Sequence, residues 1–341
     1  MINIGVLGTS GIAERRMIPA IRKDGTFRYA GTAYSTREEM GFQGTDGEFE
    51  PVLARKLEKA ARFQSSFGGK IYEGYRSLLE DPGVEAVYIA LPPALHFRWA
   101  SEALRRGKHV LLEKPLTARG EDTEALVRLS REKRAALAEN YGFPWHAQMK
   151  IIRGWLEEGA IGELRQVRAT FGFPHRAADD FRYSRELGGG ALLDCGGYTL
   201  RAAAELLGPD LEVLAASAGT AEGHEVDLWG NVLLRRGDGV CAVLSYGMDQ
   251  DYRCELELWG SRGTVTASRI FTAPDGFPAP VRLHTAAGDE ERTAADDQFL
   301  RMLQRFGRCI EEDAVREAER EQLLLQGRLT QRVRELGGLE R

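Results

Sequence analysis

Short apolar runs alternate with helical segments over the first 140 residues, and this alternation constrains the fold most. The runs are too short for helices and are rich in β-branched residues, whereas the segments between them have helical spacing or composition. Apolar strands that alternate with helices predict a parallel sheet covered on both faces. We expect strands at Ile2–Leu7, Phe27–Tyr34, Ala86–Leu91, His109–Leu112 and Ala135–Glu139, helices at Pro51–Phe63, Tyr75–Glu80, Ala94–Arg106 and Thr123–Arg134, and a surface loop at Gly41–Glu50.

Beyond residue 140 the pattern changes to successive strands joined by short turns such as Arg236–Gly239. This pattern predicts an antiparallel sheet, and hence an α/β domain over residues 1–140 followed by an α+β domain over residues 141–341. The densely charged tail from Asp297 to Glu340 is expected to be helical. The other elements expected here are a helix at His146–Glu158 and strands at Leu164–Phe173, Val213–Ala218, Asp227–Arg235, Val240–Met248 and Cys254–Trp259.

The composition excludes several classes of protein. The 46 Lys and Arg residues against 51 Asp and Glu residues form no basic block, so nucleic-acid binding is disfavoured. No apolar run has the length needed to cross a bilayer, and the N-terminus has no secretory features, which predicts a cytoplasmic protein. We expect free thiols and no metal site, because the cysteines lie far apart without a CxxC motif at Cys195, Cys241, Cys254 and Cys309.

A glycine turn directly follows the first expected strand. Gly8-Thr9-Ser10-Gly11-Ile12-Ala13 stands between that strand and the first helix, where a dinucleotide-binding fold places its phosphate loop. Glycine lets the backbone approach a pyrophosphate, and the amides at the helix N-terminus attract its charge. Ser10 and Ala13 occupy the second and third positions of the G-x-G-x-x-G/A pattern, so a plain glycine turn remains the alternative.

The end of the second expected strand bears on which dinucleotide binds. NAD-binding domains place a carboxylate there for the ribose 2′-hydroxyl, whereas this sequence has Ser35, Thr36 and Arg37. An arginine can bind a 2′-phosphate through charge-assisted hydrogen bonds, which a carboxylate would oppose. The cluster therefore predicts NADP(H). A strand that ends one or two residues later would bring in Glu38 and favour NAD instead.

Two further polar segments follow the next expected strands, where open α/β sheets place their ligands. One is Leu91-Pro92-Pro93 with His96, and the other is Glu113-Lys114-Pro115. Lys114 can hold its ammonium against a substrate oxygen, and a cis bond before Pro115 is one way to orient it. The alternatives are an exposed loop lysine and a histidine with a purely structural role.

These segments together resemble the glucose-fructose oxidoreductase/inositol dehydrogenase family. The resemblance covers about residues 2–310 and rests on Gly8-x-x-Gly11-x-Ala13, Pro92-Pro93-x-x-His96, Glu113-Lys114-Pro115 and the run from Gly188 to Tyr198. It implies a Rossmann domain followed by an α+β domain with an open, largely antiparallel sheet. It also implies that Lys114, Asp194 and Tyr198 meet at a nicotinamide.

Tyr198 stands where other branches of that family have histidine, which implies the branch of sugar oxidoreductases and dihydrodiol dehydrogenases. We expect Tyr198 to protonate a carbonyl oxygen as hydride arrives, with Lys114 polarising that oxygen. Asp194 would position this pair or the sugar hydroxyls. The structural alternatives are that Asp194 caps a helix starting near Gly196 and that Tyr198 is a packed helix residue.

A narrower resemblance is to bacterial nucleotide-sugar 3-ketoreductases, which use NADPH in deoxysugar biosynthesis. It rests on the first glycine turn, on Asp180-Phe181-Arg182-Tyr183 and on the segment from Trp259 to Pro274. It implies that Arg182 lies near the cofactor and that Tyr252 faces the sugar, although Arg182 could equally be a surface ion-pair partner. Cys254 departs from the polar residue that relatives often carry. The expected cofactor contacts are then Gly8, Thr9, Ser10, Gly11, Ile12, Ala13, Ser35, Thr36, Arg37, Leu91, Pro92, His96, Glu113, Lys114 and Arg182, and the expected substrate contacts are Lys114, Asp194, Tyr198 and Tyr252.

The sequence thus predicts an NADPH-dependent reductase of a keto-sugar, with a dTDP-linked 3-keto-deoxyhexose as substrate. One alternative is an NADP-dependent dehydrogenase that oxidises a free sugar, inositol or a trans-dihydrodiol. Another is a non-catalytic dinucleotide-binding regulator, which would have no chemical need for Lys114 and Tyr198. We expect a homo-oligomer formed through the open sheet and no membrane partner.

Overall fold

The computed structural model describes residues 1–339, which form two compact units. The first comprises Met1–Leu116, Asp122–Asn140 and Met302–Arg320, and the second comprises Thr117–Glu121, Tyr141–Arg301 and the chain from Glu321 onward. Residues 302–320 therefore group with the first unit, whereas the sequence placed them in a second domain over 141–341. Glu340, where the predicted helical tail ends, lies outside the described residues.

The first unit is built on a six-stranded parallel sheet with the order β3-β2-β1-β4-β5-β6, which confirms the predicted parallel sheet. The strand order reverses between β1 and β4, and such a switch point is where doubly wound sheets bind ligands. The strands are β1 (Ile2–Leu7), β2 (Phe27–Tyr34), β3 (Lys70–Glu73), β4 (Ala86–Ile89), β5 (His109–Leu112) and β6 (Leu137–Glu139). The helices between them are η1 (Ala13–Met17), α1 (Ile18–Lys23), α2 (Arg37–Met40), α3 (Asp46–Phe67), α4 (Tyr75–Glu80), η2 (Pro93–Leu95), α5 (His96–Arg105) and α6 (Gly120–Glu132).

The loop expected at Gly41–Glu50 is partly wrong, because α3 already begins at Asp46. Thr45 and Glu48 form a reciprocal capping box, with the Thr45 amide donating to the Glu48 carboxylate over 2.7 Å. This pairing satisfies backbone donors at the helix start. Pro51 consequently lies inside the helix rather than at its beginning.

The second unit is built on an eight-stranded sheet with the order β14-β13-β12-β11-β7-β10-β9-β8. Its neighbours are antiparallel except for β7 and β10, which confirms the largely antiparallel sheet. The strands are β7 (Leu164–Gly172), β8 (Leu211–Gly219), β9 (Trp229–Arg236), β10 (Cys241–Gly247), β11 (Arg253–Gly260), β12 (Gly263–Ser268), β13 (Ala279–Thr285) and β14 (Gly288–Ala294). The helices are η3 (Phe143–Trp145), α7 (Ala147–Glu157), η4 (Phe181–Tyr183), η5 (Leu192–Gly196) and α8 (Gly197–Leu207). Helices α9 (Gln298–Glu311) and α10 (Asp313–Leu336) each have residues in both units.

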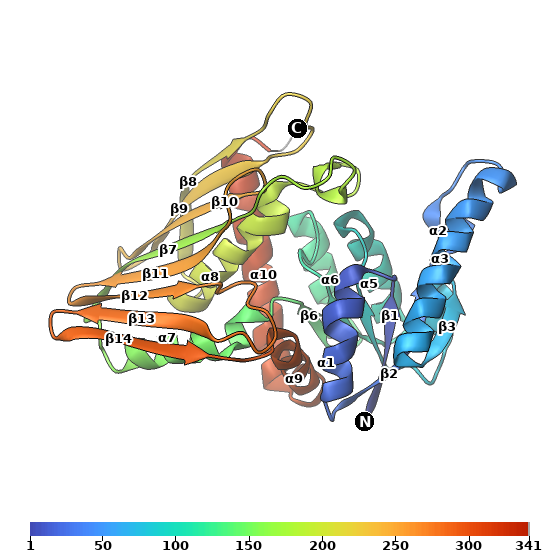
Figure 1. Ribbon diagram of the computed structural model, residues 1–341, viewed down its shortest axis with the longest axis horizontal. Helices are drawn as coiled ribbons and strands as arrows, with labels where there is room; N and C mark the ends of the chain where they lie inside the picture. Colours follow the sequence, from blue (N-terminus) through green and yellow to red (C-terminus); the bar gives the residue numbers. More distant parts are fainter. Residues whose placement is uncertain (340–341) are drawn as a thin grey trace. The chain divides into compact units, whose positions relative to one another are not determined.

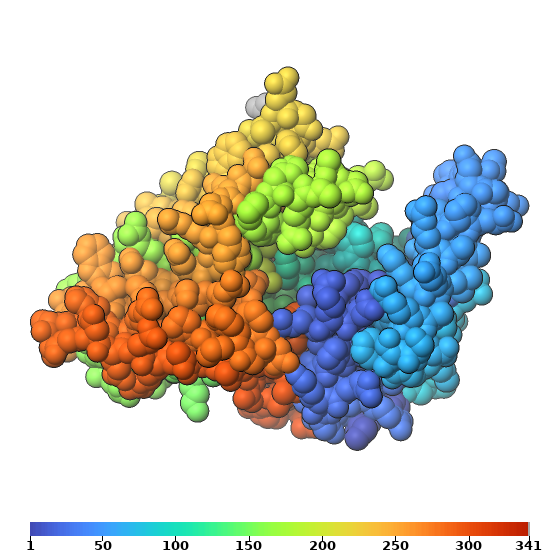
Figure 2. Space-filling view, viewed as in Figure 1, coloured from blue at the N-terminus to red at the C-terminus, as the bar shows by residue number. Residues whose placement is uncertain are grey.

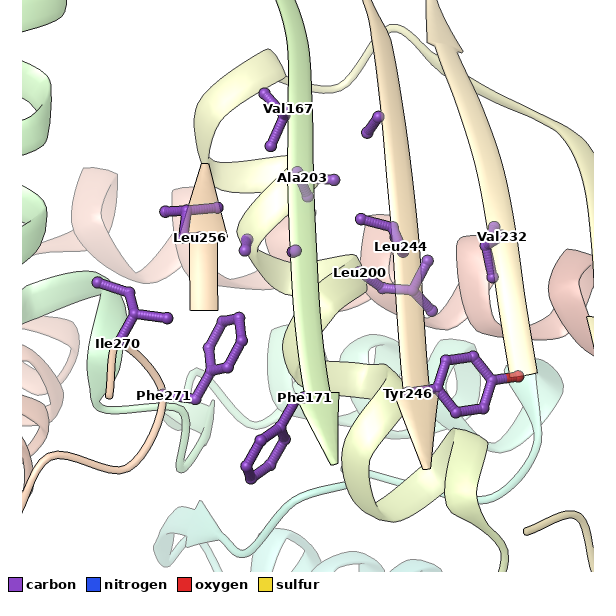
Figure 3. Packing of buried hydrophobic residues seen from close by; sticks show 14 of the residues in the cluster. Val167, Phe171, Leu200, Ala203, Val232, Leu244, Tyr246, Leu256, Ile270 and Phe271 are labelled. Atoms are coloured by element: carbon purple, nitrogen blue, oxygen red, sulfur yellow. The ribbon is translucent and has the colours of Figure 1, made fainter. Parts of the chain in front are cut away.

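One face of this sheet carries the core of the second unit. Side chains alternate along the strands, so that Val167, Ala169 and Phe171 of β7 are buried while Arg168 is exposed and Thr170 is half-buried. Helix α8 packs on β7 and β10, and Leu200 points into the same cluster (Figure 3). Helices therefore cover one face and leave the other open (Figure 1).

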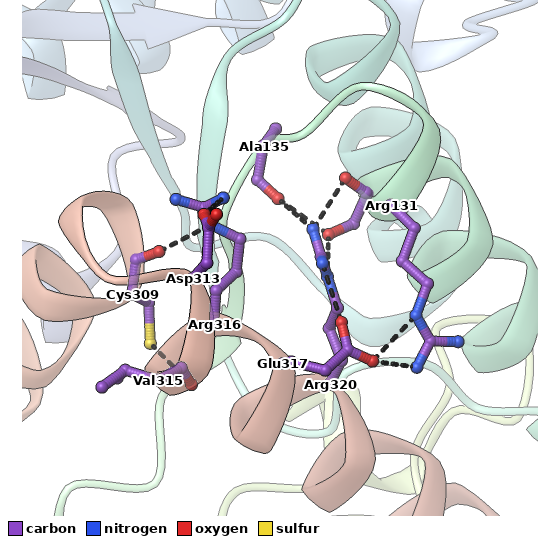
Figure 4. A network of polar contacts seen from close by, with 9 residues as sticks. Arg131, Ala135, Cys309, Asp313, Val315, Arg316, Glu317 and Arg320 are labelled. Atoms are coloured by element: carbon purple, nitrogen blue, oxygen red, sulfur yellow. Dashed lines mark hydrogen bonds and ion pairs between the residues drawn. The ribbon is translucent and has the colours of Figure 1, made fainter.

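The start of α10 is bound to the first unit by buried polar contacts (Figure 4). The guanidinium of Arg320 donates to Ser130 Oγ over 3.0 Å, to the Ser130 carbonyl over 2.9 Å and to the Ala135 carbonyl over 3.1 Å. Glu317, one turn earlier, accepts from Arg131 Nε over 3.0 Å and pairs with Arg320 at the same distance. These contacts explain why residues 302–320 group with the first unit.

Within residues 1–339, no helix has the length and apolar composition of a membrane span, and no three metal-ligating side chains cluster. The four cysteines are free thiols. Burial raises the pKa of Cys309 to about 12, which makes its thiolate rare near neutral pH.

We expect Arg320→Ala to lower the free energy of unfolding by about 2–3 kcal/mol, because it leaves buried carbonyl and hydroxyl oxygens without their donor. Arg332→Ala is the control, since the ion-pair partner of this exposed arginine of α10 among residues 1–339 is Glu335, across 2.8 Å. Urea denaturation should show a change within about 0.5 kcal/mol for the control. Equal effects of the two substitutions would contradict the assigned role of Arg320.

Candidate functional site

Gly8 forms the turn that follows β1. Its φ of 96° is one that side chains rarely adopt, and a Cβ there would lie 2.8 Å from Leu91 Cδ2 and 3.0 Å from the Ala90 carbonyl oxygen. Its amide donates to the Ala33 carbonyl over 3.0 Å. The turn therefore requires glycine, and it brings the ends of β1, β2 and β4 together.

Ser10, in the second position of the glycine pattern, caps the helix that follows. Its hydroxyl accepts from the Ala13 amide over 3.2 Å, and its carbonyl accepts from the Glu14 amide over 3.1 Å. A side-chain cap of this kind satisfies an amide at the helix start. Thr9, Gly11 and Ile12 are half-buried in the same turn.

The residues after β2 are held in different ways. Thr36 caps α2 through a capping box with Glu39, whose amide donates to Thr36 Oγ1 over 3.2 Å. The guanidinium of Arg37 donates to the Asp46 carboxylate and the Gly44 carbonyl. Arg37 thus has protein partners at the position where the sequence expects it to meet a phosphate.

Lys56 is a basic residue at this place that the sequence analysis missed. It lies on α3, 21 residues after Ser35, and its Nζ donates to the Ser35 hydroxyl over 2.8 Å. Burial lowers the pKa of Lys56, as does the nearby Lys59, while Glu39 opposes this change. No local pattern marks Lys56, because only the packing of α3 beside β2 brings it to the strand end.

His96 ties the turn after β4 to the turn after β5. Its Nδ1 lies 2.8 Å from the Pro115 carbonyl oxygen, and its Nε2 lies 2.8 Å from the Leu91 carbonyl oxygen. The ring is fully buried, and this burial lowers the pKa of His96 although both carbonyls raise it. His96 therefore positions the two turns through its ring and is closed off from solvent. Pro92 lies half-buried in the first of these turns.

Glu113 turns its carboxylate toward the first unit's own side chains. It accepts from the Tyr88 hydroxyl and from Asn140 Nδ2, the latter over 2.6 Å. Burial raises the pKa of Glu113, and these two donors partly offset the rise. Lys114 follows directly, half-buried at the end of β5, and the Lys114–Pro115 bond is cis.

In the second unit, Asp227 caps the helix formed by η5 and α8. Its Oδ2 accepts from the Leu192 amide over 2.7 Å, and its carbonyl accepts from the Ala191 amide over 2.8 Å. A Cβ on Gly190 would lie 2.4 Å from Asp227 Oδ1, so this approach requires glycine, whose φ is 119°. Burial raises the pKa of Asp227 to about 6. Asp227, and not Asp194, is therefore the capping carboxylate here.

Asp194 lies in the first turn of that helix and pairs with Arg182. Arg182 Nε donates to Asp194 Oδ2 over 2.7 Å, and its Nη1 donates to Asp180 Oδ1 over 3.1 Å. Burial by itself lowers the pKa of Arg182, but the ion pairs with Asp194 and Asp180 outweigh it and raise the pKa. Arg182 thus holds the Asp194 carboxylate in a fixed place.

Tyr198 lies one turn further along and is surrounded by aromatic rings. Its ring centroid lies 4.8 Å from that of Tyr141, 5.1 Å from Phe171 and 5.7 Å from Phe271, and Phe143 is also adjacent. Tilted and edge-to-face contacts of this kind fix the direction of a ring. Tyr198 is thus a packed helix residue, as the structural alternative expected. This packing is compatible with a chemical role, because it orients the phenol.

Tyr252 precedes β11, and its side chain is 39% exposed. The Tyr252 hydroxyl lies 3.4 Å from Thr272 Oγ1, and Cys254 Sγ lies 3.7 Å from Thr272 Oγ1. Thr272 follows Phe271, so Tyr252 and the rings around Tyr198 share one end of the sheet.

The predicted residues thus fall into one group in each unit. In the first unit, contacts join the turns after β1, β2, β4 and β5, which carry Gly8, Ser35, Leu91, His96 and Glu113. In the second unit, contacts join Arg182 to Asp194 and connect Tyr198 to the strand ends beside Tyr252.

Known protein families match both parts of the chain. The model described as "Oxidoreductase family, NAD-binding Rossmann fold" matches residues 2–141. The model of the GFO/IDH/MocA C-terminal domain matches residues 149–266.

Individual relatives agree with these matches. The chain is 42% identical over 91% of its length to the dTDP-3,4-didehydro-2,6-dideoxy-alpha-D-glucose 3-reductase of Saccharopolyspora spinosa, of which it covers 87%. It is 27% identical over 93% of its length to D-xylose 1-dehydrogenase (NADP(+)) 2 of Haloferax volcanii, of which it covers 92%.

A solved structure is similar over nearly the whole chain. It is KijD10, a 3-ketoreductase from Actinomadura kijaniata in complex with NADP and TDP-benzene, with a TM-score of 0.88 and 36% identity over 98% of this chain and 97% of that one. Together with the family models and the two curated relatives, this similarity confirms the resemblance drawn from the sequence motifs. The chain belongs to the GFO/IDH/MocA family of oxidoreductases.

Proposed function

We propose that this protein is an NADPH-dependent reductase that acts on the 3-keto group of a dTDP-linked deoxyhexose. The observation that carries the proposal is the 42% identity, over 91% of the chain, to a dTDP-3,4-didehydro-2,6-dideoxy-alpha-D-glucose 3-reductase. The 36% identity to KijD10, a 3-ketoreductase in complex with NADP and TDP-benzene, supports the same substrate class and cofactor.

The first unit has features that fit a dinucleotide. The turn at Gly8 leaves no room for a Cβ because Leu91 and Ala90 lie against it, so the turn after β1 packs closely on the end of β4, at the switch point where doubly wound sheets bind ligands. The cofactor contacts in our proposal are Gly8, Thr9, Ser10, Gly11, Ile12, Ala13, Ser35, Thr36, Arg37, Leu91, Pro92, Lys114 and Arg182, and His96 and Glu113 support the turns that carry several of them. The contacts of Glu113 with Tyr88 and Asn140, and those of His96 with two carbonyls, favour positioning roles for these two.

We add Lys56 to this set as a ligand of the 2′-phosphate. Its ammonium already donates to Ser35 Oγ over 2.8 Å, so a phosphate beside Ser35 would meet a second donor there. Arg37 already donates to the Asp46 carboxylate and the Gly44 carbonyl, which occupy part of its guanidinium. Lys56 therefore has fewer competing protein contacts than Arg37 within the described residues.

The proposed mechanism assigns one task to each of three side chains. NADPH, when bound, supplies the hydride. Tyr198 donates a proton to the carbonyl oxygen of the substrate, and Lys114 polarises that oxygen through its positive charge. Asp194, held by Arg182 over 2.7 Å, accepts hydrogen bonds that orient the sugar hydroxyls, and Tyr252 lies against the sugar.

A second candidate is an NADP-dependent dehydrogenase that oxidises a free sugar, inositol or a trans-dihydrodiol. The 27% identity to a D-xylose 1-dehydrogenase (NADP(+)) favours it, because the same residues would serve the reverse reaction. Turnover of nucleotide-linked and free sugars distinguishes the two.

We also propose that the protein self-associates through the open face of the sheet in the second unit. A row across this face consists of Leu233, Val243, Arg168, Glu257 and Thr266. Trp259 lies on the same face with 56% of its side chain exposed. An exposed tryptophan on a sheet face that also carries Leu233 and Val243 is typical of a protein interface, and Arg168 and Glu257 form an ion pair of 3.6 Å on this face.

Tyr198→Phe should reduce turnover at least about a hundredfold, because it removes the proton donor and keeps the ring. The affinity for NADPH should stay the same, as measured by fluorescence titration. The control is Tyr246→Phe in the same unit, whose buried hydroxyl has no hydrogen-bond partner among the described residues. Unchanged turnover in Tyr198→Phe would remove this residue from the mechanism.

We expect the wild-type protein to bind NADPH more tightly than NADH. Lys56→Ala should weaken NADPH binding about tenfold by removing a charge-assisted hydrogen bond, and Arg37→Ala should weaken it less. The affinity for NADH should not change in either variant. The control is Lys59→Ala, an exposed lysine on the same helix. Equal wild-type affinities for both cofactors would refute the phosphate argument.

Trp259→Arg should convert an assembled protein into monomers in sedimentation velocity, because it places an unpaired charge in the proposed interface. Leu57→Arg, at an exposed leucine of α3, should leave the sedimentation coefficient unchanged. A wild-type protein that sediments as a monomer, or a Trp259→Arg variant that stays assembled, would count against the open face.

A further inference from the structure

Arg269 adopts a backbone conformation that is unusual for its residue type. It follows β12 directly, and its φ of 51° lies in the left-handed region. Glycine or asparagine forms such a turn at lower cost, so an arginine here is not explained by the backbone. Strained residues of this kind are concentrated at functional sites. The reason for an arginine at this position must therefore lie in its side chain.

The guanidinium of Arg269 lies between two aromatic rings. Its central carbon is 5.3 Å from the ring centroid of Tyr252 and 5.4 Å from that of Phe277. Both rings are partly exposed, and Arg269 itself is exposed. No carboxylate within residues 1–339 forms an ion pair with it, although most other arginines of the second unit have one. Its donors therefore remain available for an anion from solution.

This arginine lies at the sheet end that carries the rings around Tyr198. Register pairs Glu255 with Ser268 and Arg253 with Gly172, so Arg269, Tyr252 and Phe173 all follow at the same end of the sheet. Phe271, two residues after Arg269, points into the core and packs against Tyr198 at 5.7 Å (Figure 3).

A second arginine is stacked in a similar way nearby. The central carbon of Arg176 lies 4.6 Å from the ring centroid of Phe173, whose carbonyl accepts from the Gln250 amide over 3.2 Å. Arg176 is exposed and belongs to the projecting segment around residues 174–190, which is lime green in the space-filling view (Figure 2). Two stacked, exposed guanidinium groups thus flank the segment that carries Tyr252.

We propose that Arg269, assisted by Arg176, binds the diphosphate of a nucleoside diphosphate group on the substrate. This inference rests on the proposed function and adds the residues that distinguish a nucleotide-linked sugar from a free one. A guanidinium stacked between rings keeps its N–H edge directed outward, and this edge matches two phosphate oxygens. A free sugar is uncharged and would gain little from Arg269. A diphosphate is negatively charged and can form the ion pair that Arg269 does not form with any carboxylate within residues 1–339.

The test compares Arg269→Asn with the wild-type protein, using dTDP as the probe in isothermal titration calorimetry. Asparagine tolerates the left-handed backbone but has no positive charge. We expect the Kd for dTDP to rise at least tenfold, while the affinities for thymidine and NADPH and the melting temperature stay unchanged. Arg269→Lys should give a smaller rise, because it keeps the charge and loses the planar donors.

The control is Arg165→Asn, at an exposed arginine that pairs only with Glu163 across 2.7 Å. It should leave the Kd for dTDP unchanged. Any of three results would overturn the inference: no binding of dTDP to the wild type, a Kd within twofold of wild type in Arg269→Asn, or an equal loss in the control. A lower melting temperature with parallel loss of thymidine binding would make Arg269 structural and would also overturn it.

The outcome is separable from that of the proposed reductase activity. Binding of dTDP that depends on Arg269, without NADPH-linked reduction of a keto-sugar, would refute the reductase and keep the diphosphate site. NADPH-dependent reduction of a dTDP-linked keto-sugar, with dTDP binding insensitive to Arg269, would refute the assigned diphosphate site and keep the reductase.

Discussion

Hydrogen bonds made by buried polar side chains at strand ends determine the geometry of both groups of candidate residues. A buried polar group without a partner costs free energy, so each of these side chains fixes the backbone that it contacts. His96 lies 2.8 Å from carbonyls of two different turns, and Asp227 accepts from the start of the helix that carries Asp194 and Tyr198. The residues proposed to react thus stand on turns and helices that their neighbours hold in place.

The charges in the second unit divide the proposed chemistry between two residue types. Arg182 Nε donates to Asp194 Oδ2 over 2.7 Å, so this carboxylate oxygen acts as a hydrogen-bond acceptor. The proposed proton donor is Tyr198, whose ring is oriented by the aromatic rings packed around it. Arg269, in contrast, lacks a carboxylate within the described residues and suits an external anion.

Several elements were predictable from the sequence because their local pattern matches their environment. The buried strand β4 is wholly apolar, and the glycine turn after β1 is recognisable from its spacing. β14 was missed because Gly288–Ala294 is polar and exposed along nearly all of its length, so no alternation marks it. It forms a strand by pairing with β13, which is a long-range interaction that local patterns do not contain.

The sequence by itself determined the parallel and antiparallel sheets, the family and the identity of the candidate residues, because strand alternation and short motifs are local properties of the chain. Only the tertiary structure decided which partners these residues have. In the structure, Lys56 donates to Ser35, which lies 21 positions earlier, and Arg37 pairs with Asp46. Asp227, rather than Asp194, caps the helix. Such pairings depend on how helices and strands pack, and packing brings together residues whose separation along the chain carries no signal.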